Sequence, residues 1–79
     1  MLNALLNFDA EVERGALYRR PLSGSVVETA KVIDIAQDKM GIPHVRFQLQ
    51  VARGTDARVE QRTLALDIFY ARYKERIAS

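Results

Sequence analysis

Cysteine is absent from this chain of 79 residues, and histidine occurs once, at His44. Disulfides and thiolate metal sites are therefore excluded, and a site built from several histidines is excluded as well. The four glycines are isolated from one another, so the sequence has no glycine-rich phosphate loop or dinucleotide motif. We expect neither a cofactor nor a bound metal.

Long apolar runs are also lacking. No stretch approaches the roughly 20 residues that a helix needs to cross a bilayer. The first eight residues, MLNALLNF, contain no basic residue and are soon followed by Asp9, Glu11 and Glu13. This pattern is unlike a secretory signal peptide. We therefore expect a protein of the cytoplasm with no membrane partner.

Neither sign of charge is in large excess. Twelve Lys and Arg stand against ten Asp and Glu, which gives a net charge of +2. Nine of the twelve basic residues are arginine, whose planar guanidinium suits bidentate contacts. Dedicated nucleic-acid binders usually concentrate more positive charge than this.

The length predicts one domain with a modest core. A chain of this size buries about 60–65% of its unfolded surface. Such cores rarely give more than about 3–5 kcal/mol, and small domains often add a disulfide, a metal or a partner subunit. Self-association is the one of these devices that the composition leaves open.

Residues 43–53 show the clearest pattern in the sequence. Apolar side chains alternate with polar ones, and a β-strand turns its side chains over at every residue. The buried face is predicted to hold Val45, Phe47, Leu49 and Val51. The solvated face is predicted to hold His44, Arg46, Gln48 and Gln50.

The rest of the chain predicts one domain, residues 1–79, in three parts. Residues 1–14 form an N-terminal segment with a short helix over 2–13, residues 15–64 a β-meander, and residues 66–77 a C-terminal helix. The strands are expected at residues 16–20, 26–37, 43–53 and 58–64. The C-terminal helix carries an apolar stripe made of Leu66, Phe69, Tyr70, Tyr73 and Ile77, with Asp67 as its N-cap.

The register between the second and third predicted strands follows from burial. Ile35 opposite Val45, and Ile33 opposite Phe47, place four apolar side chains on the inner face. This register also sets Asp34 opposite Arg46 on the outer face as an ion pair. A bulge near residues 31–32 would turn Lys31 outward.

The next hairpin is expected to have a three-residue loop, with Val51 opposite Val59. Arg58, Glu60 and Arg62 then lie on the outer face, and Gln61 points inward.

These elements together predict a mainly β protein with a C-terminal α-helix. A strongly bent meander of this size resembles a small SH3-like barrel. Gly15 and Tyr18 at the start of the first strand, and a final strand that runs into a Phe/Tyr helix, also resemble that architecture.

The sequence offers little for catalysis, and we expect no enzyme and no small-molecule substrate. A nucleophilic triad needs a positioned base, and only His44 is available. Ser23 and Ser25 lie in a Gly/Pro loop, where serine is a common turn residue. Glu28 and Asp34 lie roughly 20 Å apart along one strand, too far to act as a carboxylate pair.

The predicted outer face is a candidate binding surface for a protein partner or a nucleic acid. Guanidinium groups and an aromatic ring are the groups that hold phosphates and stack bases. The candidate residues are Arg46, Arg58, Arg62, His44, Tyr18 and Arg20. Because Asp34 and Glu60 share this face, the sequence favours a solvated and largely neutralised sheet surface over a binding surface.

A second candidate surface lies near the N-terminus, where Leu2, Leu5, Leu6 and Phe8 cluster. They either cover an open end of the barrel or pack against a second copy or another partner. The sequence thus favours a non-enzymatic interaction module, with self-association left open, and a nucleic-acid-binding barrel is the alternative.

Overall fold

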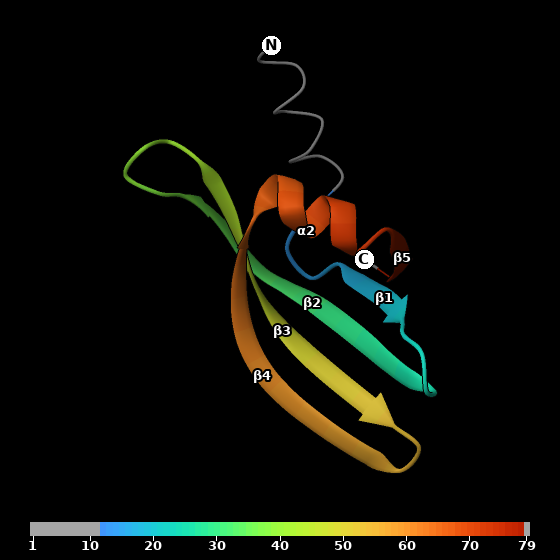
Figure 1. Cartoon of the computed structure of the whole chain (residues 1–79). Helices are drawn as coiled ribbons and strands as arrows, with labels where there is room; N and C mark the ends of the chain where they lie inside the picture. The colour runs from blue at the N-terminus through green and yellow to red at the C-terminus, as the bar shows by residue number, and fades with distance from the viewer. Residues whose placement is uncertain (1–11, 79) are drawn as a thin grey trace.

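One antiparallel sheet of five strands makes up most of the computed structural model, which describes residues 12–78 (Figure 1). Along the chain the elements are β1 (Leu17–Pro21), β2 (Val26–Gln37), β3 (Pro43–Arg53), β4 (Asp56–Ala65), α2 (Leu66–Arg72) and β5 (Glu75–Ala78). Their order in the sheet is β4-β3-β2-β1-β5. The first four strands form the predicted meander, and the mainly β class with a helix near the C-terminus is confirmed. The sheet is not closed, because β4 and β5 form its two edges.

The C-terminal helix is shorter than predicted. It ends at Arg72 instead of continuing to residue 77, and the N–H of Tyr73 donates to the carbonyl of Phe69 at 2.8 Å. The next residues form β5, which pairs with β1 and places Arg76 opposite Tyr18. Pairing of β5 with β1 gives the backbone groups of both strands hydrogen-bond partners. A further turn of α2 would satisfy only its own backbone groups and not those of β1. Ile77 therefore lies on an edge strand, about half exposed.

The start of α2 also differs from the prediction. Ala65 occupies the N-cap position, and no side chain caps the helix. Asp67 lies in the first turn, where its carboxylate accepts the N–H of Ile68 at 2.8 Å. A carboxylate there still favours the positive end of the helix dipole.

The core lies between α2 and one face of the sheet, which we call the helix face. Figure 1 shows α2 lying over one end of the sheet, while β2, β3 and β4 extend beyond it. The predicted burial of Val45, Phe47 and Leu49 is confirmed, and Val51 is partly buried. The ring of Phe47 lies 5.0 Å from that of Phe69, so the central strand packs directly on the helix.

The β2–β3 register is confirmed in part. Ile35 opposes Val45 and Asp34 opposes Arg46, as predicted. Val32, however, takes the place opposite Phe47, because the register shifts between Val32 and Asp34. The bulge thus falls one residue later than predicted, at Ile33. Lys31 is exposed, as expected once a bulge is present.

Asp34 and Arg46 do not form the predicted ion pair. The Oδ1 atom of Asp34 instead accepts Nη2 of Arg14 and the backbone N–H of Ile35, each at 2.9 Å. The Asp34 carboxylate therefore pairs with Arg14 instead of Arg46.

The β3–β4 register is one residue away from the prediction. Arg53 opposes Asp56 across a turn of two residues, and Val51 therefore opposes Arg58 instead of Val59. Gly54 has φ +58° and Thr55 does not have a positive φ, which fits a type II′ turn with glycine at its first central position.

A shift of one residue moves every side chain of a strand to the other face. Arg58, Glu60 and Arg62 therefore lie on the helix face, while Val59 and Gln61 lie on the opposite face. We call this second face the open face, since α2 packs on the other side of the sheet.

Candidate interaction surface

The structure divides the six predicted binding residues between the two faces of the sheet. His44 and Arg46 lie on the open face, and the other four lie on the helix face. The division follows from the corrected β3–β4 register and from Tyr18 opposing Ala30, a core residue. The predicted single arginine surface is therefore wrong.

Several of these side chains already have partners. Tyr18 is 4% exposed and meets Phe69 edge to face at 5.4 Å, so its ring belongs to the core. Arg62 Nη2 donates to Glu60 Oε2 at 3.1 Å. The His44 Nδ1 atom lies 3.0 Å from the carbonyl oxygen of Ile42. The predicted helix over 2–13 lies almost entirely outside the described residues, as do the candidate self-association residues Leu2, Leu5, Leu6 and Phe8.

Arg20 takes part in a three-residue contact that ties the sheet to the C-terminal end of the helix. The Oε1 atom of Glu28 accepts Nη1 of Arg20 at 3.2 Å and the hydroxyl of Tyr73 at 3.1 Å. Burial and the nearby Glu28 carboxylate raise the pKa of Tyr73 above its usual value near 10. The charge of Arg20 is therefore paired with that of Glu28 within the protein.

The longest exposed feature of the sheet is the edge strand β4. It runs for ten residues without proline, glycine or a register shift. In a two-residue hairpin the pair beside the turn exchanges both hydrogen bonds, and hydrogen-bonded pairs then alternate along the ladder. The even-numbered residues of β4 therefore bond to β3, and the odd-numbered residues direct N–H and C=O away from the sheet.

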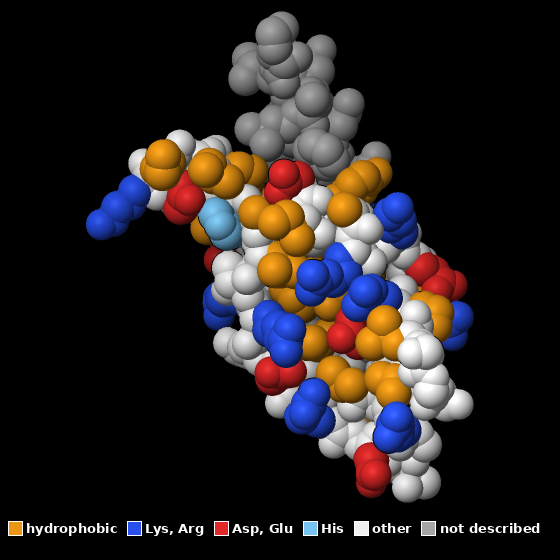
Figure 2. All heavy atoms as spheres, viewed as in Figure 1, with side chains coloured by type: hydrophobic (Ala, Val, Ile, Leu, Met, Phe, Trp, Pro, Cys, Tyr) orange, Lys and Arg blue, Asp and Glu red, His pale blue; other side chains and the backbone are white. Residues whose placement is uncertain are grey.

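The side chains of β4 differ strongly between the two faces. On the helix face the signs of charge alternate through Asp56, Arg58, Glu60 and Arg62. On the open face, Val59 is 57% exposed at the centre of the strand. In Figure 2, basic side chains are spread over the face that carries the helix, with acidic side chains between them.

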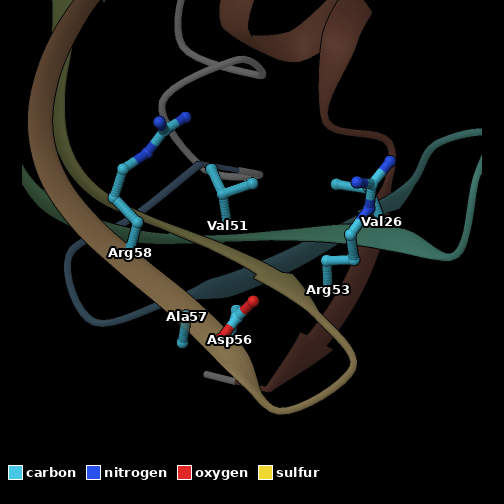
Figure 3. A pocket seen from close by; sticks show the side chains of 6 residues that line it. All are labelled: Val26, Val51, Arg53, Asp56, Ala57 and Arg58. Atoms are coloured by element: carbon cyan, nitrogen blue, oxygen red, sulfur yellow. The ribbon is translucent and has the colours of Figure 1, made fainter.

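A hollow of about 260 Å³ lies beside this strand, near the β3–β4 turn. Figure 3 shows Arg53 and Arg58 on either side of Val51, with Asp56 near the turn. Val26 and Ala57 complete the lining. Within residues 12–78, neither guanidinium forms a hydrogen bond or an ion pair. Among the described residues, two cations without a partner thus flank an apolar floor, and Asp56 is the acidic residue of the lining.

A smaller hollow of about 160 Å³ lies on the open face. Its lining includes His44 and Arg46, together with Asp34, Ala36 and Thr63. These two predicted binding residues are therefore neighbours, although they are separated from Arg58 and Arg62 by the thickness of the sheet.

Neither a metal cluster nor a membrane-spanning helix occurs in the described part of the chain. Residues 12–78 hold no group of three or more His, Asp or Glu side chains placed to bind a metal ion. Over the same range, no helix has the length and apolar character needed to span a bilayer.

No family model, curated protein or solved structure matches this chain.

Proposed function

We propose that this protein is a small, non-enzymatic interaction module that binds an extended protein segment along the free edge of β4. The observation that carries the proposal is the regular ten-residue edge, whose odd-numbered residues present backbone groups that have no partner strand in the described part of the chain. An added strand would give these groups hydrogen-bond partners, which is how many modules recognise extended peptides.

The side chains of β4 support a selective contact. The alternating charges on the helix face favour a partner strand with the opposite sequence of signs. Val59 offers an apolar contact on the open face, where it is largely exposed. Charges along an edge also disfavour pairing with unrelated strands.

We further propose that the sheet is an open relative of the SH3-like barrel. Four strands form a meander, and the chain then passes through α2 so that β5 pairs with β1. The bulge at Ile33 supports this proposal, because bulges bend strands and increase their twist.

A peptide selection with an edge-blocked variant tests the interaction function. Random linear peptides are selected on the full chain and then measured against Val59→Pro and Val59→Thr. Proline removes an outward N–H and leaves the bonds to β3 in place, whereas threonine keeps both the N–H and the branched shape. We expect selected peptides to bind the wild type and Val59→Thr and to lose at least about tenfold in affinity for Val59→Pro.

Amide hydrogen exchange gives a second measurement on the same complexes. Bound peptide should slow exchange at Ala57, Val59 and Gln61, whose N–H groups face outward. Binding that survives Val59→Pro unchanged would refute the proposed use of the β4 edge.

Nucleic-acid binding is a second candidate function, favoured by the guanidinium groups of Arg53 and Arg58 around the hollow, neither of which has a partner within residues 12–78. A labelled single-stranded oligonucleotide would be titrated at several salt concentrations against the wild type and Arg53→Ala/Arg58→Ala. Each lost phosphate contact should reduce the salt slope by about 0.7. Arg46→Ala, on the open face, is the control. Equal slopes for all three proteins would exclude this function.

A further inference from the structure

We propose that the segment bound at the β4 edge is β4 of a second copy of this chain, which pairs antiparallel about a twofold axis at Val59. The two sheets would then form one continuous sheet of ten strands. This inference rests on the proposed function, since it requires the β4 edge to be the contact surface. Backbone geometry, side-chain charge and the choice of register each support it.

The backbone geometry allows this pairing. A twofold axis at Val59 places Val59 opposite Val59, and Ala57 opposite Gln61 of the second copy. These are the odd-numbered residues, whose N–H and C=O groups point away from β3. Each such pair exchanges two hydrogen bonds, so the outward groups of residues 57, 59 and 61 all gain partners.

The charges on the helix face are complementary in this arrangement. Arg58 lies opposite Glu60 of the second copy, and Asp56 lies opposite Arg62. By symmetry each pair occurs twice. These even-numbered residues form the non-hydrogen-bonded pairs of the new ladder, in which facing side chains lie closest. The charge pattern of β4 is therefore complementary to that of a second β4 that runs antiparallel to it.

Neighbouring registers lose this complementarity. An axis at Glu60 sets Glu60 against Glu60, and Arg58 against Arg62. An axis at Gln61 keeps the contact between Glu60 and Arg62 but sets Arg58 against Leu64. Only the axis at Val59 pairs all four charged residues with opposite charges, so it defines one register.

The existing contacts of β4 allow its charged side chains to change partners when the second copy binds. The Glu60–Arg62 ion pair within the chain is exposed, with 35% and 48% of the two side chains accessible. Such pairs contribute little to stability, and Glu60 can turn to Arg58 of the second copy. Arg58 itself makes no ion pair within residues 12–78. At the same time the exposed Val59 side chain meets its own copy on the open face.

Charge reversal followed by mixing tests this dimer in the full chain. Sedimentation equilibrium should give twice the monomer mass for the wild type. Arg58→Glu sets glutamate against glutamate in both halves of its dimer, and Glu60→Arg sets arginine against arginine. Each variant alone should therefore raise the dimer Kd about tenfold or more.

Mixing the two variants should recover a dimer. In one half of the mixed pair the glutamate introduced at position 58 faces the arginine introduced at position 60. In the other half the native Arg58 and Glu60 still face each other. The double variant Arg58→Glu/Glu60→Arg should recover the dimer alone, because it exchanges the two signs in both halves.

The control is Arg46→Glu, which makes the same charge change on the open face and should leave the Kd unchanged. Circular dichroism shows whether each variant is folded. Recovery on mixing cannot result from misfolding, since each parent alone is expected to dimerise at least about tenfold more weakly than the mixture.

Three results would overturn the inference. One is a wild type that is monomeric at all concentrations. Another is a dimer that Arg58→Glu leaves intact, which would exclude the Val59 register. The third is a dimer lost in Leu5→Asp and kept in Arg58→Glu, which would assign the contact to the N-terminal cluster. None of these refutes the proposed function, because the peptide selection with Val59→Pro tests the edge independently.

Discussion

At the scale of single residues, Tyr73 connects the helix to a charged pair on the sheet. Its ring is buried and its hydroxyl donates to Glu28, which also binds Arg20. Ionisation of this hydroxyl would place a second negative charge beside Glu28. The hydroxyl therefore stabilises the fold only while it is protonated.

We expect the free energy of unfolding to fall in alkaline solution because of Tyr73. Its pKa is raised in the folded state, so its contribution is complete below pH 10 and is lost as the pH rises through the folded-state pKa. Tyr73→Phe should cost about 1.5 kcal/mol at pH 7, the value of a hydrogen bond to a charged group. Urea unfolding from pH 8 to pH 12 measures both effects. A decline of the same steepness in Tyr73→Phe would show that another group is responsible.

Phe47 is the residue that joins the central strand to the helix. It is fully buried, and its ring lies 5.0 Å from Phe69 and 5.6 Å from Tyr73. Phe47→Leu keeps an apolar side chain but removes both aromatic contacts, so we expect a loss of about 1–2 kcal/mol. Gln48→Ala, on the exposed side of the same strand, should change stability by less than about 0.5 kcal/mol. Urea unfolding gives both values, and equal effects would contradict this assignment of the core.

At the scale of elements, the β3–β4 turn sets the face on which each charge of β4 lies. Gly54 has a positive φ, and no atom lies within 4 Å of the position that a Cβ would take. The effect of a side chain there is therefore backbone strain alone. We expect Gly54→Ala to destabilise the protein by about 1 kcal/mol or more, and Thr55→Ala to have little effect. Thermal unfolding measures the difference, and equal melting temperatures would contradict the assigned turn.

The same turn explains which parts of the sheet can be predicted from the sequence. The alternation over 43–53 is long enough to set the faces of β3, and the apolar side chains of Ile35, which is partly buried, and Val45, which is fully buried, set their pairing. The β4 strand has no comparable apolar pattern, so its register depends on the length of the turn. The two-residue loop with glycine first in Arg53-Gly54-Thr55-Asp56 is the signal that places Arg58 correctly.

The C-terminal helix differs from its prediction for another reason. Residues 66–73 carry a genuine helical pattern, and Ile77 continues it by spacing alone. Whether a four-residue segment pairs with β1 depends on tertiary contacts that periodicity does not report. The candidate site is limited in the same way. The sequence identifies the arginines, but the face on which each one lies depends on the β3–β4 register.

At the scale of the whole molecule, the open sheet leaves two unequal edges. The β4 edge is ten residues long, and β5 is only four residues long and ends the chain's described part. Long regular edges are templates for unwanted pairing, and natural proteins restrain them with charges. If two copies join through β4, the free edges of the combined sheet are the two short β5 strands, so assembly stops at two copies.

The alternating charges of β4 should therefore both allow two copies to pair and limit that pairing to one register. Arg58→Thr/Glu60→Thr/Arg62→Thr replaces them with a residue of high strand propensity, so β4 can pair in many registers and with many strands. We expect this variant to form thioflavin-positive aggregates at concentrations where the wild type stays clear. Arg46→Thr lowers the net charge from +2 to +1, as the triple variant does, and should stay in solution. Equal light scattering from the two variants would show that net charge, and not the order of charges along β4, protects the edge.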